Sequence, residues 1–321
     1  MQEPWVEKYR PKTLDEVVGN PQVVSRLQAV VRGASLPHLL LSGPPGCGKT
    51  TMILCLARQV LGEEWFSQAV LELNASDDRG IEVIRSKVKT FAQQKLSLPS
   101  GKQKIIILDE ADSMTEGAQQ ALRRTMEIYA TSTRFALACN TPSKIIEPIQ
   151  SRCAVVRMRR LEDSEIAQRL EQILKLENVS WEPSGLEAIV FTADGDMRNA
   201  LNNAQATVCG FGKLSQENVF KVCDQPHPIL VKEILQNALD QNVNKSNEIL
   251  CSLWNKGYSA LDIVQTLFRI ARSHEMDEQL RLQVMKAVGK THMKVMEGCS
   301  SLIQLTALTG ILSRASESTI S

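Results

Sequence analysis

The stretch HLLLSGPPGCGKTTMILCLARQVL, residues 38–61, decides the fold of this chain. It joins an apolar run typical of a strand to a glycine-rich loop and then to a run of helical character. Glycines let such a loop turn its backbone N–H groups inward, and the N-terminus of the following helix adds positive potential. The stretch therefore predicts a site for the phosphates of a nucleotide. The pattern G-x-x-x-x-G-K-[ST] is met by Gly43, Pro44, Pro45, Gly46, Cys47, Gly48, Lys49 and Thr50.

Two side chains of this loop carry most of the expected chemistry. Lys49 should reach the β- and γ-phosphates, and the hydroxyl of Thr50 should hold Mg²⁺. We expect the loop residues and the next one, Thr51, to line the nucleotide. ATP and Mg²⁺ are therefore the predicted cofactors.

A second apolar run, Ile105-Ile106-Ile107-Leu108, ends in the two carboxylates Asp109 and Glu110. Mg²⁺ in proteins takes few carboxylates together with waters and phosphate oxygens, which suits a single aspartate. We therefore place Asp109 beside the metal and Glu110 beside an attacking water, where a hydrolase needs a base. We expect Asp112 to cap a turn rather than to bind the metal.

Asn140 closes a third apolar run, TRFALACN, residues 133–140. A polar side chain at the carboxyl end of a strand faces the crevice where ligands bind in parallel sheets. Asn140 is therefore a candidate to orient the water or to contact the γ-phosphate. A turn-forming role before Thr141-Pro142 is the alternative, and local sequence leaves both open.

Short apolar runs alternate with amphipathic runs in the first half of the chain, which predicts an α/β fold with parallel strands and crossover helices. The central runs are apolar throughout, as expected for strands covered on both faces. We expect strands at 36–43, 69–76, 104–111, 133–140 and 153–158, and helices at 21–32, 49–61, 80–95, 116–130 and 144–150.

After about residue 160 the strand pattern stops, and helical spacing of apolar residues takes over. The two prolines of DQPHP, residues 224–228, indicate a boundary within this helical part. We therefore predict a nucleotide-binding domain at 1–158, a small helical domain at 159–224 and a second helical domain at 225–321.

Composition limits what else the chain can be. At 321 residues, with 43% hydrophobic and 23% charged residues, it is typical of a globular protein of two or three domains. A net charge of +1 argues against general binding to polyanions, so contact with nucleic acid must come from a local patch. The eight cysteines include no C-x-x-C pair, and the apolar runs are too short to span a bilayer. We expect reduced thiols, no zinc site and no membrane contact.

Residues 79–104 are the one candidate for a basic patch. Arg85 and Lys89 are four apart, a spacing that places both side chains along one edge of a helix. Such an edge can follow the phosphates of a nucleic-acid strand without reading its sequence. A solvated basic face is the alternative. Against the single acid Glu82, the basic residues are Arg79, Arg85, Lys87, Lys89, Lys95, Lys102 and Lys104.

These elements, in this order, resemble the AAA+ ATPases, and further segments make the resemblance narrower. Together they are similar to the small ATPase subunits of replication factor C, the eukaryotic sliding-clamp loader, over essentially the full length. The segments are PWVEKYRPKTLDEVVGN (4–20), ELNASDDRG (72–80), DEADSMTEGAQQALRRTME (109–127), IIEPIQSRC (145–153) and GDMRNALNN (195–203).

The resemblance implies roles for residues outside the loop. Arg152 matches an arginine finger that reaches the nucleotide of a neighbouring subunit, and Arg198 matches a sensor carried on a helical lid domain to its own site. Two departures from the family pattern are Cys47, where Thr or Ser is usual, and Asp77, where Asn is common. The segment that lines the adenine pocket in the family is matched by Tyr9, Arg10, Pro11, Val18 and Gly19.

The resemblance also implies partners. These are the other subunits of a heteropentamer, the sliding clamp and primer–template DNA, with DNA-backbone contacts at Arg79, Arg85 and Lys89. It further implies a nuclear location, a C-terminal oligomerising collar and alternative complexes with another large subunit. Arg123 and Arg124 could face either the neighbouring site or DNA, and the sequence leaves that open.

Two other kinds of function remain as alternatives. One is a different AAA+ motor such as a branch-migration helicase, which the Ser151-Arg152-Cys153 motif and the helical tail disfavour. The other is an architectural subunit that binds nucleotide without turnover, which the presence of Lys49 and Glu110 disfavours.

Overall fold

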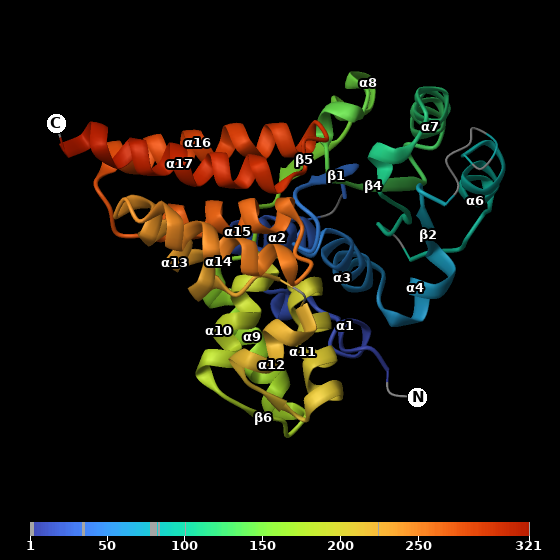
Figure 1. Cartoon of the computed structure of the whole chain (residues 1–321). Coiled ribbons are helices and arrows are strands. Elements are labelled where there is room, and N and C mark those ends of the chain that lie inside the picture. Colours follow the sequence, from blue (N-terminus) through green and yellow to red (C-terminus); the bar gives the residue numbers. More distant parts are fainter. Residues whose placement is uncertain are drawn as a thin grey trace. The chain divides into compact units, whose positions relative to one another are not determined.

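This computed structural model describes residues 3–33, 36–77, 82, 84–99, 101–223 and 225–320. The chain forms two compact units, Met1–Gln216 and Glu217–Ser321. The first holds a parallel sheet with helices around it, and the second is helical (Figure 1). The domain limits proposed near residues 158 and 224 stay predictions.

The first unit begins with short helices and contains every described strand. In chain order its elements are α1 (Trp5–Lys8), η1 (Leu14–Glu16), α2 (Pro21–Arg32), β1 (Leu39–Ser42), α3 (Lys49–Leu61), α4 (Glu63–Ala69), β2 (Val70–Asn74), η2 (Ile84–Val88), α6 (Lys89–Gln93), β3 (Lys104–Asp109), η3 (Ala111–Ser113), α7 (Glu116–Ile128), β4 (Thr133–Cys139), η4 (Pro142–Lys144), α8 (Glu147–Gln150), β5 (Ala154–Arg157), α9 (Asp163–Leu176), β6 (Ser180–Trp181), α10 (Pro183–Ala193), α11 (Met197–Phe211) and β7 (Lys213–Leu214).

The main sheet has the strand order β2-β3-β4-β1-β5, and all its neighbours are parallel. Leu40 of β1 is level with Leu137 of β4 on one side and with Val155 of β5 on the other. The predicted α/β fold with crossover helices is confirmed. A further two-stranded pairing joins β6 and β7.

Alternate residues of the strands pack on opposite faces of the sheet, which explains why the runs are apolar throughout. Leu39, Leu41 and Ile107 pack with α2 and α3 on one face. Leu40 and Ile106 pack on the other face, in the core that also contains the buried side chains of α7. Both faces of the central strands β1, β3 and β4 are therefore buried, and polar groups of the sheet are available at its ends and on its edge strands β2 and β5.

Two expected helices differ in detail from the structure. The helix expected at 144–150 is shorter: Lys144 ends the 3₁₀ turn η4, and the helix α8 begins only at Glu147. Each of these elements has a proline in its first turn. Proline lacks a backbone N–H and therefore begins helices rather than continuing them. The run expected at 80–95 is described as a π-helical turn, η2, followed by α6.

Two lysines of the expected basic patch bind backbone carbonyls, and one of them is buried, so the patch has fewer free cations than the sequence count suggests. Lys104 is only 3% exposed. Its ammonium donates to the carbonyls of Phe91 (2.8 Å), Ala92 (2.6 Å) and Gln94 (2.7 Å) at the end of α6. Lys102 donates to the carbonyl of Leu61 at the end of α3, at 2.8 Å.

The second unit has its own apolar core, formed by residues of α13 to α17. Its elements are α12 (Gln216–Cys223), α13 (Pro228–Leu239), α14 (Val243–Asn255), α15 (Ala260–Ser273), α16 (Glu278–Met296) and α17 (Leu302–Ile320).

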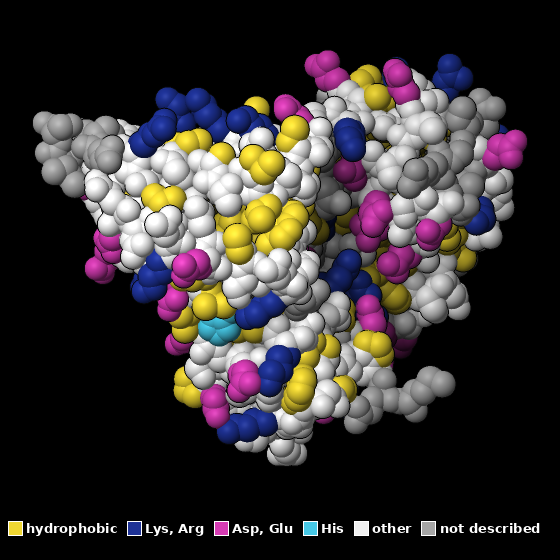
Figure 2. Space-filling model, viewed as in Figure 1, with side chains coloured by type: hydrophobic (Ala, Val, Ile, Leu, Met, Phe, Trp, Pro, Cys, Tyr) yellow, Lys and Arg dark blue, Asp and Glu magenta, His cyan; other side chains and the backbone are white. Residues whose placement is uncertain are grey.

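Much apolar surface of the second unit stays exposed, and basic side chains gather over α16 (Figure 2). Among the described helices, none is both long and apolar enough to cross a membrane. The large apolar residues that remain exposed on this unit are Ile229, Phe268, Leu282, Met293, Met296, Ile303 and Ile311.

We predict that Lys104→Met lowers the free energy of unfolding of the first unit by roughly 2 kcal/mol, because it leaves buried carbonyls at the end of α6 without a donor. Urea unfolding measures this difference. Lys95→Met is the matched control, since Lys95 is exposed in the same segment and should change stability by less than about 0.5 kcal/mol. Equal effects of the two substitutions would contradict the assignment.

Candidate active site

The strand order brings the predicted site together at one edge of the sheet. β4 lies between β1 and β3, so the loop after β1, the end of β4 and the end of β3 are neighbours. One cavity at this edge contains side chains from all three segments and from α11. Its lining is Pro45, Gly46, Gly48, Lys49, Thr50, Thr51, Asp109, Glu110, Ala138, Cys139, Asn140 and Arg198.

Gly46 is required both by its backbone and by its neighbours. Its φ is +66°, in the left-handed region that favours glycine. A Cβ at this position would meet Oδ1 of Asp196 at 1.7 Å. The backbone N–H of Met197 donates to the carbonyl of Gly46 at 3.2 Å, so the N-terminus of α11 sits directly on the loop. This contact places Arg198, the second residue of α11, in the cavity.

The ammonium of Lys49 lies at the centre of the loop. It donates to the carbonyls of Gly43 (2.9 Å) and Pro44 (2.8 Å) and to Oδ1 of Asn140 (2.8 Å). Lys49 is buried, with 9% of its surface exposed. A buried ammonium needs such acceptors, because an unpaired charge away from water is costly. The three contacts fix the cation where the loop surrounds it.

The hydroxyl of Thr50 donates to Oδ2 of Asp109 at 2.6 Å, which joins the start of α3 to the end of β3. The other carboxylate oxygen of Asp109 accepts the backbone N–H of Glu110 at 2.8 Å. Glu110 has a φ of +49°, unusual for a residue with a side chain. Its side chain is exposed and lines the cavity. The strained turn thus separates the two carboxylates: that of Asp109 is hydrogen-bonded on both oxygens, and that of Glu110 is exposed in the cavity.

The geometry around Asn140 favours the site role over the turn role. The turn after β4 is held by Asp112, which accepts the backbone N–H groups of Asn140 (3.3 Å) and Thr141 (3.1 Å). The side chain of Asn140 is therefore not needed for the turn and instead contacts Lys49.

A second cavity adjoins the first and shares with it Gly46, Gly48, Thr51 and Arg198. It has apolar walls from the N-terminal segment and from the helices after β5. Cys47 also lines it, and burial raises the pKa of this thiol, so the thiol stays protonated at neutral pH. The lining residues are Val6, Glu7, Tyr9, Arg10, Pro11, Val17, Val18, Gly46, Cys47, Gly48, Thr51, Leu161, Arg169, Met197, Arg198 and Leu201.

The N-terminal segment is bound to helices that come much later in the chain. The hydroxyl of Tyr9 donates to Oε1 of Glu177 at 2.6 Å, and Lys8 forms an ion pair with the same oxygen at 2.6 Å. The guanidinium of Arg169 donates to the carbonyl of Tyr9 at 3.2 Å. The backbone N–H of Trp5 donates to Oε1 of Gln205 at 2.9 Å. The wall that carries Tyr9 is therefore attached to α9 and α11.

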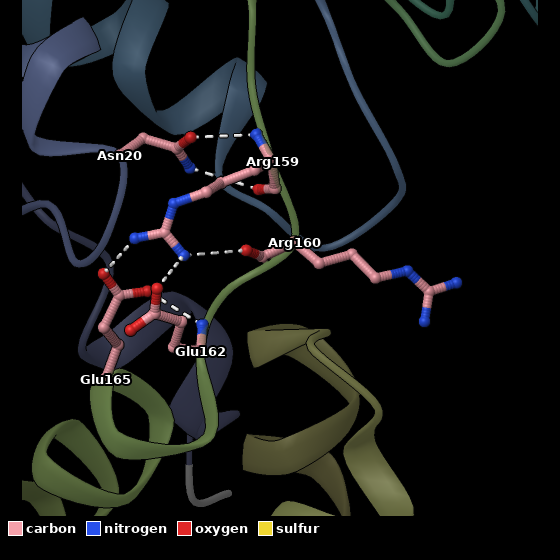
Figure 3. Close-up of polar contacts among 5 residues, drawn as sticks. All are labelled: Asn20, Arg159, Arg160, Glu162 and Glu165. Atoms are coloured by element: carbon pink, nitrogen blue, oxygen red, sulfur yellow. Dashed lines mark hydrogen bonds and ion pairs between the residues drawn. The ribbon is translucent and has the colours of Figure 1, made fainter. Parts of the chain in front are cut away.

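The linker between β5 and α9 is held by a compact polar network (Figure 3). The amide of Asn20 bonds both backbone groups of Arg159, accepting its N–H at 2.8 Å and donating to its carbonyl at 3.2 Å. The guanidinium of Arg159 pairs with Glu162 at 3.1 Å and with Glu165 at 2.8 Å, in the first turn of α9. Arg160 points away from this network and pairs with Asp194. The linker thus joins the N-terminal loop to the later helices.

Some predicted residues lie outside the two cavities. Gly43 and Pro44 contribute carbonyls to Lys49 rather than cavity wall. Gly19 faces the linker, since a Cβ there would meet Cδ2 of Leu161 at 2.3 Å. Arg152 is about one-third exposed and pairs with Glu127 on α7.

The predicted DNA contacts are described only in part. Arg79 and the side chain of Arg85 lie outside the described residues. Lys89 is exposed at the start of α6. Of the two undecided arginines, Arg123 pairs with Glu127 at 3.1 Å and Arg124 is exposed.

Sequence reasoning missed the residues that the later helices contribute to the second cavity. They belong to ordinary amphipathic helices, whose spacing shows only which face is buried, so no local signal could have found them. These residues are Arg169, Met197 and Leu201; Leu161, in the linker before α9, was missed as well.

Two family models match parts of this chain. Residues 39–161 match the family described as "ATPase family associated with various cellular activities (AAA)", and residues 226–310 match "Replication factor C C-terminal domain". Replication factor C subunit 2 of Arabidopsis thaliana is 58% identical, over 97% of this chain and 93% of the relative. The chain belongs to the replication factor C family.

Other replication factor C proteins are also similar over nearly their whole length. Subunit 4 of Saccharomyces cerevisiae is 54% identical over 96% of this chain and 95% of its own. The small subunit of the archaeon Methanococcus maripaludis is 44% identical over 96% and 98%. The motifs predict a likeness to the second subunit, and the eukaryotic relatives named here carry the numbers 2 and 4.

Among solved structures, the Thermotoga maritima RuvB Holliday junction branch migration motor superimposes with a TM-score of 0.55. The match covers 76% of this chain and 85% of that one, at 18% identity. At that identity the likeness concerns the fold alone, an ATPase fold with a nucleotide-binding loop. The replication factor C relatives disfavour the branch-migration alternative.

We predict that Gly46→Ala lowers the free energy of unfolding of the first unit by about 2–4 kcal/mol, because the new Cβ must displace Asp196 as well as adopt a left-handed backbone. Gly212→Ala is the matched control. Gly212 has a φ of +70° with no atom within 4 Å of an added Cβ, so only the backbone cost of about 1 kcal/mol applies. Urea unfolding compares the two, and equal losses would contradict the close approach of Asp196.

Proposed function

We propose that this chain is an ATP-hydrolysing subunit of a clamp loader, which opens a sliding clamp and loads it on primer–template DNA. The observation that carries this proposal is the convergence of Lys49, Asp109, Glu110, Asn140 and Arg198 in one cavity. A cation, a metal-binding carboxylate, a base and an arginine in one place are the groups that phosphoryl transfer to water requires.

The two adjoining cavities fit the two halves of ATP. The adenine ring occupies the apolar cavity that Tyr9, Pro11 and Val18 line, and the phosphates follow the loop toward Lys49. Because α9 and α11 share this wall with the N-terminal segment, nucleotide binding draws the later helices and the loop into one arrangement.

Thr50 and Asp109 suit Mg²⁺ by their chemistry. They place a hydroxyl oxygen and a carboxylate oxygen 2.6 Å apart beside the loop, and Mg²⁺ takes oxygen ligands with few carboxylates. When bound there, Mg²⁺ would neutralise charge on the β- and γ-phosphate oxygens.

Hydrolysis uses groups of two subunits. Glu110 accepts a proton from the water that attacks the γ-phosphorus, while Lys49 and Arg198 bind the negative oxygens. Arg152 lies on the surface, away from both cavities, and serves the nucleotide of a neighbouring subunit. Hydrolysis is therefore complete only after assembly, and its free energy drives release of clamp and DNA rather than covalent chemistry on DNA.

Several observations support assembly with other replication factor C subunits. The exposed apolar residues of the second unit form the kind of surface that marks protein contacts, and the relatives are named as subunits. We place the complex in the nucleus, with DNA-backbone contacts at Arg79, Arg85 and Lys89. Alternative complexes with another large subunit belong to the same proposal.

We predict that Glu110→Gln in the assembled complex retains ATP binding. It should lower the rate of the chemical step at this site at least about a hundredfold, because the amide cannot accept the proton. DNA- and clamp-stimulated ATP turnover and binding of a fluorescent ATP analogue measure the two effects.

Glu187→Gln, an exposed glutamate on α10, is the control and should leave both unchanged. Unchanged turnover and clamp loading with Glu110→Gln would mean an architectural site, and the proposed hydrolysis would then be wrong.

We predict that Lys89→Gln weakens DNA binding and reduces the slope of log K against log salt by about 0.9, the value for one lost phosphate contact on a duplex. Titrations at several salt concentrations measure the slope. Lys175→Gln, on α9 in an exposed ion pair, is the control. A slope unaltered by Lys89→Gln would remove this residue from the DNA surface.

A further inference from the structure

Arg152, the proposed arginine finger, is held by two acceptors of its own chain. One Nη donates to the carbonyl of Pro148 at 2.6 Å, within the short helix α8. The other Nη forms an ion pair with Oε1 of Glu127, 25 residues earlier in the chain. Glu127, a residue outside both cavities, thus fixes the position of the guanidinium.

Glu127 is well suited to hold a cation in place. It lies in the last turn of α7, whose buried residues Leu122 and Met126 anchor that helix in the sheet core. Its Oε1 also accepts Nε of Arg123 at 3.1 Å. The hydrogen bond from Arg123, followed by the charge of Arg152, lowers the pKa of Glu127, so the carboxylate is ionised at neutral pH.

The segment that leads to Arg152 is fixed to α7 at a second point. The side chain of Gln119 donates to the carbonyl of Lys144 at 3.0 Å and accepts the backbone N–H of Ile146 at 2.8 Å. Gln119 lies in the first half of α7 and Glu127 at its end. Gln119 and Glu127 of α7 therefore hold the segment from Lys144 to Arg152 at both of its ends.

The contacts of Arg152 leave part of its guanidinium available. Of its five N–H groups, the bonds to Pro148 and Glu127 use one on each Nη. The side chain is 34% exposed, and it is not among the described residues that line the two cavities. With a third of the side chain exposed, its remaining donors can meet an anion of another chain.

We propose that Glu127 is a positioning residue for Arg152. It holds the guanidinium so that the N–H groups not bonded to Pro148 or Glu127 meet the phosphates in the neighbouring subunit. The inference rests on the proposed trans role of Arg152. A free arginine side chain loses rotamer freedom when it docks, whereas one that is already held loses little. We expect this difference to change the rate of hydrolysis at the neighbouring site about three- to tenfold.

The test uses an assembled complex in which this chain carries Glu110→Gln, so the remaining ATP turnover comes from other subunits. Into that background go Glu127→Ala, Arg152→Ala and the double substitution. We expect Arg152→Ala to give the larger loss. Glu127→Ala should lower kcat about three- to tenfold with little change in KM, and the double substitution should equal Arg152→Ala.

Glu171→Ala is the matched control for removal of a surface ion pair. Glu171 pairs with Lys175 four residues away, and its side chain is 39% exposed, as is that of Glu127. It should leave the remaining turnover unchanged. Subunit assembly by gel filtration and thermal melting show whether each variant is folded.

The outcomes separate the two proposals. If Arg152→Ala leaves the remaining turnover unchanged, the trans role of Arg152 fails, and the inference about Glu127 fails with it. If Arg152→Ala acts but Glu127→Ala does not, or if their effects simply add, only the positioning role is overturned. A rise in turnover with Glu127→Ala also overturns it, because Glu127 would then restrain the finger.

Discussion

The position of β4 between β1 and β3 is the constraint on which the rest of the site depends. It separates the phosphate loop from the acidic end of β3 by the width of one strand, and it places Asn140 in that gap. The amide can then contact Lys49 while Thr50 reaches across to Asp109. Backbone pairing of parallel strands, rather than any side-chain contact, sets these distances. Both faces of the sheet are buried, so this end is where polar chemistry can be placed.

The second level of organisation joins this edge to helices that follow the sheet. Asp196 approaches Gly46 so closely that no side chain fits between them, and Asn20 bonds the backbone of Arg159 as a neighbouring strand would. These contacts are local in space and distant in sequence. Through such contacts the loop, the N-terminal segment and the linker are all attached to α9 and α11. A conformational change in any one of these three segments therefore requires the other two to adjust.

The sequence was sufficient for features that a local pattern encodes. The loop, the carboxylates after β3 and the parallel α/β architecture were predicted, because strand, turn and helix preferences agree over residues 38–61. The run 144–150 was predicted as a single helix, but Pro142 begins a 3₁₀ turn that ends at Lys144, and α8, with Pro148 in its first turn, begins only at Glu147. Lys104 was assigned to a basic surface, since lysine is seldom buried. Its burial depends on three carbonyls of another segment, which no local pattern reports. The same holds for the helices that complete the second cavity.

Lys104 has a further consequence, because β3 carries it at one end and Asp109 at the other. The strand spans roughly 17 Å between them, at about 3.3 Å per residue. At its start, Lys104 binds the end of α6 through three hydrogen bonds. A force applied to α6 is therefore transmitted to β3 through these three hydrogen bonds. An extended strand paired on both sides resists stretching and bending, so it transmits the force along its axis rather than absorbing it. The segment that begins with Lys89 and the turn that carries Glu110 are two ends of one stiff mechanical element.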